Sequence, residues 1–97
     1  MVTAKRDPAL IVIQLAGGND AMNTIVPYTN GIYHDSRKAI GLTDSDVLDI
    51  NGTLGFHPSM GPIKDLWDRG NVAIVQGIGY PVPNRSHFRS MDIWHTA

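Results

Sequence analysis

The sequence predicts a single α/β domain built on a parallel sheet with a helical crossover. Two continuous apolar runs, residues 9–17 and 71–79, do not alternate between polar and apolar positions, which is typical of strands buried on both faces of a parallel sheet. A segment with helical spacing lies between them, and parallel strands need such a crossover. Because two parallel strands are not stable alone, we expect the domain over 1–97 to be partial.

The first half of the chain carries three local predictions. Residues 1–8 are expected to form a flexible N-terminal segment, and Pro8 opens the first strand. That strand ends at two glycines, after which a polar loop begins. Residues 32–40 predict about two turns of helix, and Gly41 would end it.

The second half contains one hairpin signal and two helix signals. The pair Asn51-Gly52 lies between short apolar stretches and predicts a β-hairpin with a type I′ turn. Apolar residues then recur at helical spacing in a helix that would begin near residue 61, and Gly70 is suited to end it. A last helix is predicted over 86–97.

Composition excludes several classes of protein. The chain has eight Lys and Arg against nine Asp and Glu, so a surface for nucleic acid or anionic membrane is not expected. Its apolar runs are far too short to span a membrane. The absence of cysteine excludes disulfides and thiolate metal sites. A chain of 97 residues has a small core, which a homo-oligomer or a missing C-terminal remainder would complete.

Polar residues follow each predicted strand. Asn19 and Asp20 come after the first strand, and Arg85, Ser86 and His87 come after the second. Ligands of an open parallel sheet bind outside the carboxyl ends of its strands, so both loops are expected at one edge. Carboxylate and amide oxygens suit Ca²⁺, Mg²⁺ or Mn²⁺, and an added His suits Zn²⁺ or Mn²⁺. The sequence therefore predicts a divalent metal site.

Ser86 precedes the last predicted helix, where N–H groups at the positive end of the helix dipole bind phosphate or sulfate. Arg85 would hold the anion, and His87 would act as acid, base or ligand. A serine in this position is a nucleophile when a metal or base activates it. A simpler interpretation remains open, because Ser is a preferred N-cap and Gly-Gly-Asn-Asp is typical of a turn. His57 before Pro58 is likewise typical of a loop or cap.

Several motifs together resemble a known bacterial family. They are GGND followed by Asn-Thr and Pro, then Gly-x-His-Pro, then Arg-Ser-His-Phe ahead of a helix that ends near Trp, and they occur in this order within residues 9–97. The chain resembles the start of the uncharacterised family called domain of unknown function 1501. That family is similar to the alkaline phosphatase and sulfatase superfamily, so the resemblance implies an alkaline-phosphatase-like N-terminal portion of a longer protein.

The resemblance also implies roles for individual residues. The first strand of the superfamily ends in a metal-binding acid, which matches Asp20, with Asn19 beside it. The nucleophile of the superfamily lies at the N-terminus of a later helix, which matches Ser86, with Arg85 and His87 as its neighbours. The implied function is that of a metal-dependent hydrolase of small phosphate or sulfate esters.

Two departures from the family limit this implication. The twin-arginine export signal is missing, since Lys5-Arg6 does not replace it, so an exported or periplasmic location is implied by the resemblance alone. The downstream Asp and His residues that complete the superfamily's metal site are missing too. We therefore expect these residues to be inactive by themselves. A non-catalytic α/β binding or assembly module is the alternative, and a small domain held together by dimerisation is a third possibility.

Overall fold

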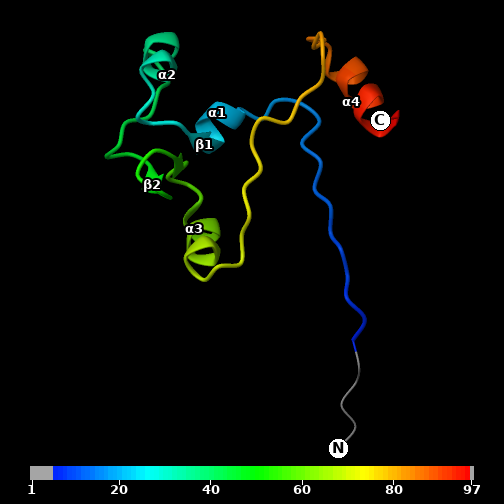
Figure 1. The fold of residues 1–97 in the computed structure, drawn as a ribbon, viewed down its shortest axis with the longest axis horizontal. Helices are drawn as coiled ribbons and strands as arrows, with labels where there is room; N and C mark the ends of the chain where they lie inside the picture. Colours follow the sequence, from blue (N-terminus) through cyan, green and yellow to red (C-terminus); the bar gives the residue numbers. More distant parts are fainter. Residues whose placement is uncertain (1–5, 97) are drawn as a thin grey trace, which may run out of the picture.

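The structure, a computed structural model, describes residues 6–96 (Figure 1). The expected flexible segment 1–8 falls mostly on residues 1–5, outside this range, and residues 6–8 are exposed without helix or strand. The elements in chain order are α1 (Ala21–Thr24), β1 (Ile25–Val26), α2 (Gly31–Ser36), β2 (Leu48–Asp49), β3 (Gly55–Phe56), α3 (Gly61–Asp68) and α4 (His87–Thr96).

The three strands form one small antiparallel sheet in the order β1-β3-β2. Phe56 of β3 lies opposite Ile25 of β1 on one side and opposite Leu48 of β2 on the other. The predicted parallel sheet with a helical crossover is therefore wrong. Strands of two residues each take the place of the two long strands that the apolar runs predicted.

The two apolar runs, residues 9–17 and 71–79, are extended but belong to no strand. We call them the extended segments; Figure 1 shows them as long irregular ribbons in blue and yellow. Leu10 and Ile13 are 89% and 81% exposed, and Val75 is 73% exposed. A run that is apolar on both faces becomes a strand only when neighbours pair with its edges and cover its faces. Within residues 6–96 no strand pairs with these segments, and few of their side chains are covered, Val72 and Ile74 being half-buried.

The predicted hairpin is present, but its turn differs from the prediction. β2 and β3 pair antiparallel, and Ile50 N donates to Leu54 O at 2.9 Å across the loop. A type I′ turn needs positive φ at both central residues, whereas only Gly52 has one here, at 86°. Asn51 instead closes the loop with its side chain, because Oδ1 accepts from the backbone N–H groups of Thr53 and Leu54.

Helix α2 is shorter than the predicted helix over 32–40. Asn30 caps it, since Oδ1 accepts from Ile32 N at 2.9 Å and from Tyr33 N at 3.3 Å. At Arg37 the backbone leaves helical geometry, with φ −130° and ψ 49°. A tight turn follows in which Gly41 N donates to Arg37 O at 2.7 Å. The helix therefore ends before Arg37, whose backbone is not helical.

The other two longer helices agree with the sequence. α3 begins at Gly61 as predicted and stops before Gly70, which has φ 77° and donates to Trp67 O at 2.9 Å. α4 occupies most of the predicted 86–97 helix. Its two aromatic side chains apart from the histidines are exposed, Phe88 by 88% and Trp94 by 60%. None of the helices described between residues 6 and 96 is long and apolar enough to cross a membrane.

The core is small and lies entirely within residues 19–70, which we call the sheet module. Its buried hydrophobic residues are Val26, Tyr33, Val47 and Phe56. The Phe56 ring meets Trp67 of α3 edge to face, with centroids 6.2 Å apart, which holds α3 against the sheet. The radius of gyration is 17.3 Å, against about 12.5 Å for a compact domain of this length. The molecule is elongated because the extended segments and α4 lie outside the module (Figure 1).

Candidate functional site

Asp20, the predicted metal ligand, precedes α1 and pairs with an arginine. Its Oδ2 lies 2.5 Å from Nη1 of Arg37. The hydrogen bond from Arg37 is the main reason that the pKa of Asp20 lies below its ordinary value, against a smaller opposing effect of burial. Arg37, which follows α2, was not among the predicted site residues. The carboxylate therefore already has a cationic partner within the sheet module.

Asn23, the second asparagine of the same stretch, connects three parts of the sheet module. Its Oδ1 accepts from the Tyr33 hydroxyl at 2.6 Å and from Arg37 Nη1 at 3.3 Å. Its Nδ2 donates to Ile40 O at 2.9 Å. The Tyr33 hydroxyl also accepts from Leu42 N at 2.9 Å. These bonds tie α1 to α2 and to the turn that follows α2.

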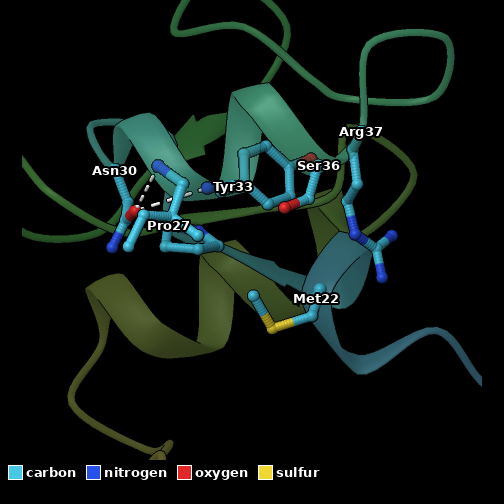
Figure 2. Close-up of a pocket in the computed structure, with 7 residues that line it drawn as sticks. Met22, Pro27, Asn30, Tyr33, Ser36 and Arg37 are labelled. Atoms are coloured by element: carbon cyan, nitrogen blue, oxygen red, sulfur yellow. Dashed lines mark hydrogen bonds between the residues drawn. The ribbon is translucent and has the colours of Figure 1, made fainter.

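A small pocket lies beside this network, between α1 and α2. Its volume is about 190 Å³, and Met22, Tyr33 and Arg37 are among the residues that line it. Figure 2 shows Tyr33 extending from α2, Arg37 extending from the chain that follows α2, and Met22 below them. The polar groups of Tyr33 and Arg37 in this pocket already bond Asn23.

A larger, open hollow of about 500 Å³ lies beside Asn19 and Asp20. The residues that line it are Leu15, Asn19, Asp20, Asn23, Thr24, His57 and Met60. Asn19 Oδ1 accepts a 3.3 Å hydrogen bond from the Thr24 hydroxyl. The hollow thus brings the two predicted metal ligands together with a histidine that the sequence analysis interpreted as a loop residue.

His57 is held in place by its backbone and its ring. Its N–H donates to Thr24 O at 3.0 Å, and Nδ1 accepts from Ser59 N at 3.0 Å. In the neutral ring the proton is therefore on Nε2. The Gly-x-His-Pro motif was the signal in the sequence that pointed to this residue.

The donor set of the hollow is chemically suited to a divalent cation but small. One carboxylate, amide oxygens and one imidazole are ligands that Mn²⁺ or Zn²⁺ accept. In the part of the chain that the structure describes, no three His, Cys, Asp or Glu side chains lie close enough together to hold a metal ion. Asn19 and Asp20 are the residues here that would contribute to such a site, because Nδ1 of His57 already accepts from Ser59 N.

Ser86, the predicted nucleophile, forms the N-cap of α4. Its Oγ accepts from Arg89 N at 3.4 Å, and its carbonyl accepts from Ser90 N at 3.0 Å. Its own N–H donates to Asn84 Oδ1 at 2.8 Å. Ser86 and Arg85 are both exposed. The capping interpretation of Ser86 is therefore confirmed, and its hydroxyl lies at the start of a ten-residue helix.

His87 joins the second loop to the first. A Cβ atom built on Gly17 would lie 2.7 Å from Cγ and 2.8 Å from Cδ2 of His87, so the imidazole lies directly against the backbone there. The two predicted loops thus touch although the shared sheet edge does not exist. Asp20 bonds Arg37 rather than any residue of the Ser86 loop. Figure 1 shows α2 and α4 at opposite ends of the molecule.

Comparisons with known proteins add no assignment. No family profile matches the chain, and neither a curated protein nor a solved structure is detectably similar to it. The resemblance to the domain of unknown function 1501 therefore stays a prediction.

Proposed function

We propose that this chain supplies the first part of the active site of a metal-dependent hydrolase of small phosphate or sulfate esters. Asp20 and Asn19 are the metal ligands that these residues contribute. Ser86 is the nucleophile, and Arg85 and His87 stand beside it. The remaining ligands come from further polypeptide, either additional sequence or a second copy.

The contact between Gly17 and His87 is the observation that supports this proposal best. The two motifs are far apart in the sequence, and the absence of a side chain at Gly17 allows the ring to approach the loop that leads to Asn19. Such an approach is what a shared site requires. If Gly-Gly-Asn-Asp were only a turn and Ser86 were only an N-cap, this contact between them would not be needed.

The chemistry of the second loop fits an anionic ester. A divalent ion would supply positive charge to the ester oxygens when it is bound. The free N–H groups at the start of α4 and the guanidinium of Arg85 attract the same anion. The hydroxyl of Ser86 lies at that end of the helix, where negative charge is stabilised.

A second candidate function is supported by a different observation. The extended segments expose Leu10, Ile13 and Val75 almost fully, and exposed apolar chain with free backbone groups pairs readily with another strand. The alternative proposal is a non-catalytic module whose extended segments assemble with a partner. In that case Asp20 serves only its ion pair with Arg37.

Metal binding by two matched variants tests the proposal. Thermal unfolding of the chain is measured with and without Mn²⁺, Zn²⁺ and Ca²⁺, beside Asp20→Asn and Arg37→Gln. Both variants lose the ion pair, but only Arg37→Gln keeps the carboxylate. If Asp20 ligates metal, one metal raises the midpoint in the parent and in Arg37→Gln but not in Asp20→Asn, because binding to the native state stabilises it.

Two other results would contradict the proposed role of Asp20. A midpoint that responds to metal in Asp20→Asn as it does in the parent excludes Asp20 as a ligand. Midpoints that no metal changes in any of the three chains, with equal loss of stability in the two variants, favour the assembly module.

A further inference from the structure

The loop between the second extended segment and α4 is closed by a tyrosine that the sequence analysis did not single out. The Tyr80 hydroxyl accepts from Asn84 N at 2.8 Å and lies 2.8 Å from Ser90 Oγ. Ser90 Oγ also donates to Asn84 O at 2.9 Å. Tyr80 precedes the loop, Asn84 lies inside it and Ser90 lies in the first turns of α4, so these bonds join both ends of the loop.

The closed loop contains a strained residue. Val82 has φ 53°, a left-handed conformation that a β-branched residue rarely adopts. Such strain persists only where the surrounding structure enforces it, and it is concentrated at functional sites. Val82 is 91% exposed, so no packing holds it in place. The hydrogen bonds between Tyr80 and Asn84 on either side of it are the restraint.

The same asparagine continues the connection to Ser86. Asn84 Oδ1 accepts from Ser86 N at 2.8 Å, and Ser86 Oγ in turn accepts from Arg89 N. The backbone N–H and C=O of Asn84 are bonded to Tyr80 and Ser90. The position of Ser86 therefore depends on Asn84, and the position of Asn84 depends on Tyr80 and Ser90.

We propose that Tyr80 and Ser90 are positioning residues for Ser86, which they hold at the N-terminus of α4 through Asn84. This inference rests on the proposed function only in assigning a chemical purpose to Ser86. The pKa of Tyr80 lies below its ordinary value because of its hydrogen bonds with Ser90 and with the backbone of Asn84. The restraint keeps the hydroxyl of Ser86 beside the free N–H groups of the helix.

A single introduced thiol measures this position without any enzyme activity. The chain has no cysteine, so Ser86→Cys carries one reactive sulfur, and a helix N-terminus lowers the pKa of a thiol. The rate of alkylation by iodoacetamide across pH gives that pKa. We expect it well below the ordinary value of about 8.5. Adding Tyr80→Phe or Ser90→Ala should raise it and slow alkylation at neutral pH by about three- to tenfold.

Three controls separate positioning from general loss of structure. Tyr28→Phe removes another hydrogen-bonded tyrosine hydroxyl, which donates to Asp49 at 2.6 Å, and should leave the thiol unchanged. Ser90→Thr keeps a hydroxyl at this position and should restore the low pKa that Ser90→Ala loses. Circular dichroism shows whether α4 remains; if Tyr80→Phe unfolds it, the pair of Ser90 variants decides.

The inference is overturned if the thiol has the same pKa and rate in Tyr80→Phe, Ser90→Ala and the unmodified background. It is also overturned if Tyr28→Phe changes the thiol as much as Tyr80→Phe does. Because the probe needs neither metal nor ester, this result is independent of the metal test of Asp20. A thiol that depends on Tyr80 in a chain that binds no metal supports the positioning role and favours the assembly module over the hydrolase.

Discussion

The sheet module and the extended segments differ in a way that composition does not anticipate. The extended segments are the most continuously apolar parts of the chain, yet most of their large side chains are exposed. The sheet module is more polar, yet it contains the buried residues Val26, Tyr33, Val47 and Phe56. Side chains of Asn23, Asn30 and Asn51 bond its backbone at turns and helix ends. Local polar bonding, rather than apolar content, decides which part folds upon itself.

The largest expected effect contrasts one residue from each region. Phe56→Ala removes a fully buried ring and its contact with Trp67, and we expect it to lower the free energy of unfolding by about 3–5 kcal/mol. Leu10→Ala removes an exposed side chain and should change that free energy by less than ~0.5 kcal/mol. Urea unfolding followed by tryptophan fluorescence measures both. A comparable loss in Leu10→Ala would show that the extended segment is covered in solution.

A smaller effect is expected from the polar network inside the module. Tyr33→Phe keeps the buried ring but removes the hydroxyl that bonds Asn23 and Leu42. We expect a loss of about 1–3 kcal/mol, because the backbone N–H of Leu42 is left without this partner. The same unfolding experiment measures it, with Tyr80→Phe outside the module as the control. Equal losses in the two variants would contradict the distinction between the regions.

Acid should lower the stability of the sheet module, because three of its aspartates accept hydrogen bonds in the folded state. Hydrogen bonds lower the pKa of three carboxyls below the ordinary value: chiefly from the Arg37 side chain for Asp20, from the Thr43 backbone for Asp46 and from the Tyr28 hydroxyl for Asp49. A group whose pKa is lowered by folding stabilises the folded state above its unfolded pKa of about 4. That contribution is lost as the pH falls through the folded pKa.

Thermal midpoints between pH 2 and pH 7 measure this loss. We expect the midpoint temperature to decrease as the pH is lowered below about 4. Each Asp→Asn replacement at 20, 46 or 49 should make this decrease less steep. A midpoint that stays level to pH 2 in the parent chain would contradict the role of these hydrogen bonds.

The smallest expected effect on stability concerns the contact between the regions. Gly17→Ala places a methyl group where the His87 ring lies, so the ring must move while the module stays intact. We expect a change in the free energy of unfolding below ~0.5 kcal/mol but a clear shift of the His87 ring signals in NMR. Gly79→Ala is the matched control, because a Cβ there meets no atom within 4 Å. Unmoved His87 signals in Gly17→Ala would mean that the two loops do not touch.

The sequence predicts those parts of the fold that local chemistry determines. The start of α3, its glycine stop and the pairing around Asn51-Gly52 depend on a few neighbouring residues, and the structure confirms them, although the turn is not the predicted type I′ turn. The parallel sheet was wrong because its prediction assumed partners for residues 9–17 and 71–79. A high content of apolar residues indicates that a segment is more stable when it is buried. Whether it is buried depends on the other elements of the fold.

The candidate site was predicted in the same partial way. Asn19 and Asp20 do line one hollow, and His87 does reach the first loop. Arg37 and Tyr80 were missed because their partners, Asp20 and Ser90, lie in other elements. The capping role of Ser86 was predicted from one neighbouring helix, whereas its dependence on Tyr80 needs the folded loop.

The elongated outline of the molecule has a consequence for its behaviour in solution. Its principal dimensions are 61 × 37 × 18 Å. With a radius of gyration of 17.3 Å, a single copy has the size of a compact protein of about twice its mass. It should therefore diffuse slowly and leave a gel-filtration column at the volume of a globular dimer. Light scattering, which reports mass independently of shape, is the measurement that counts the copies.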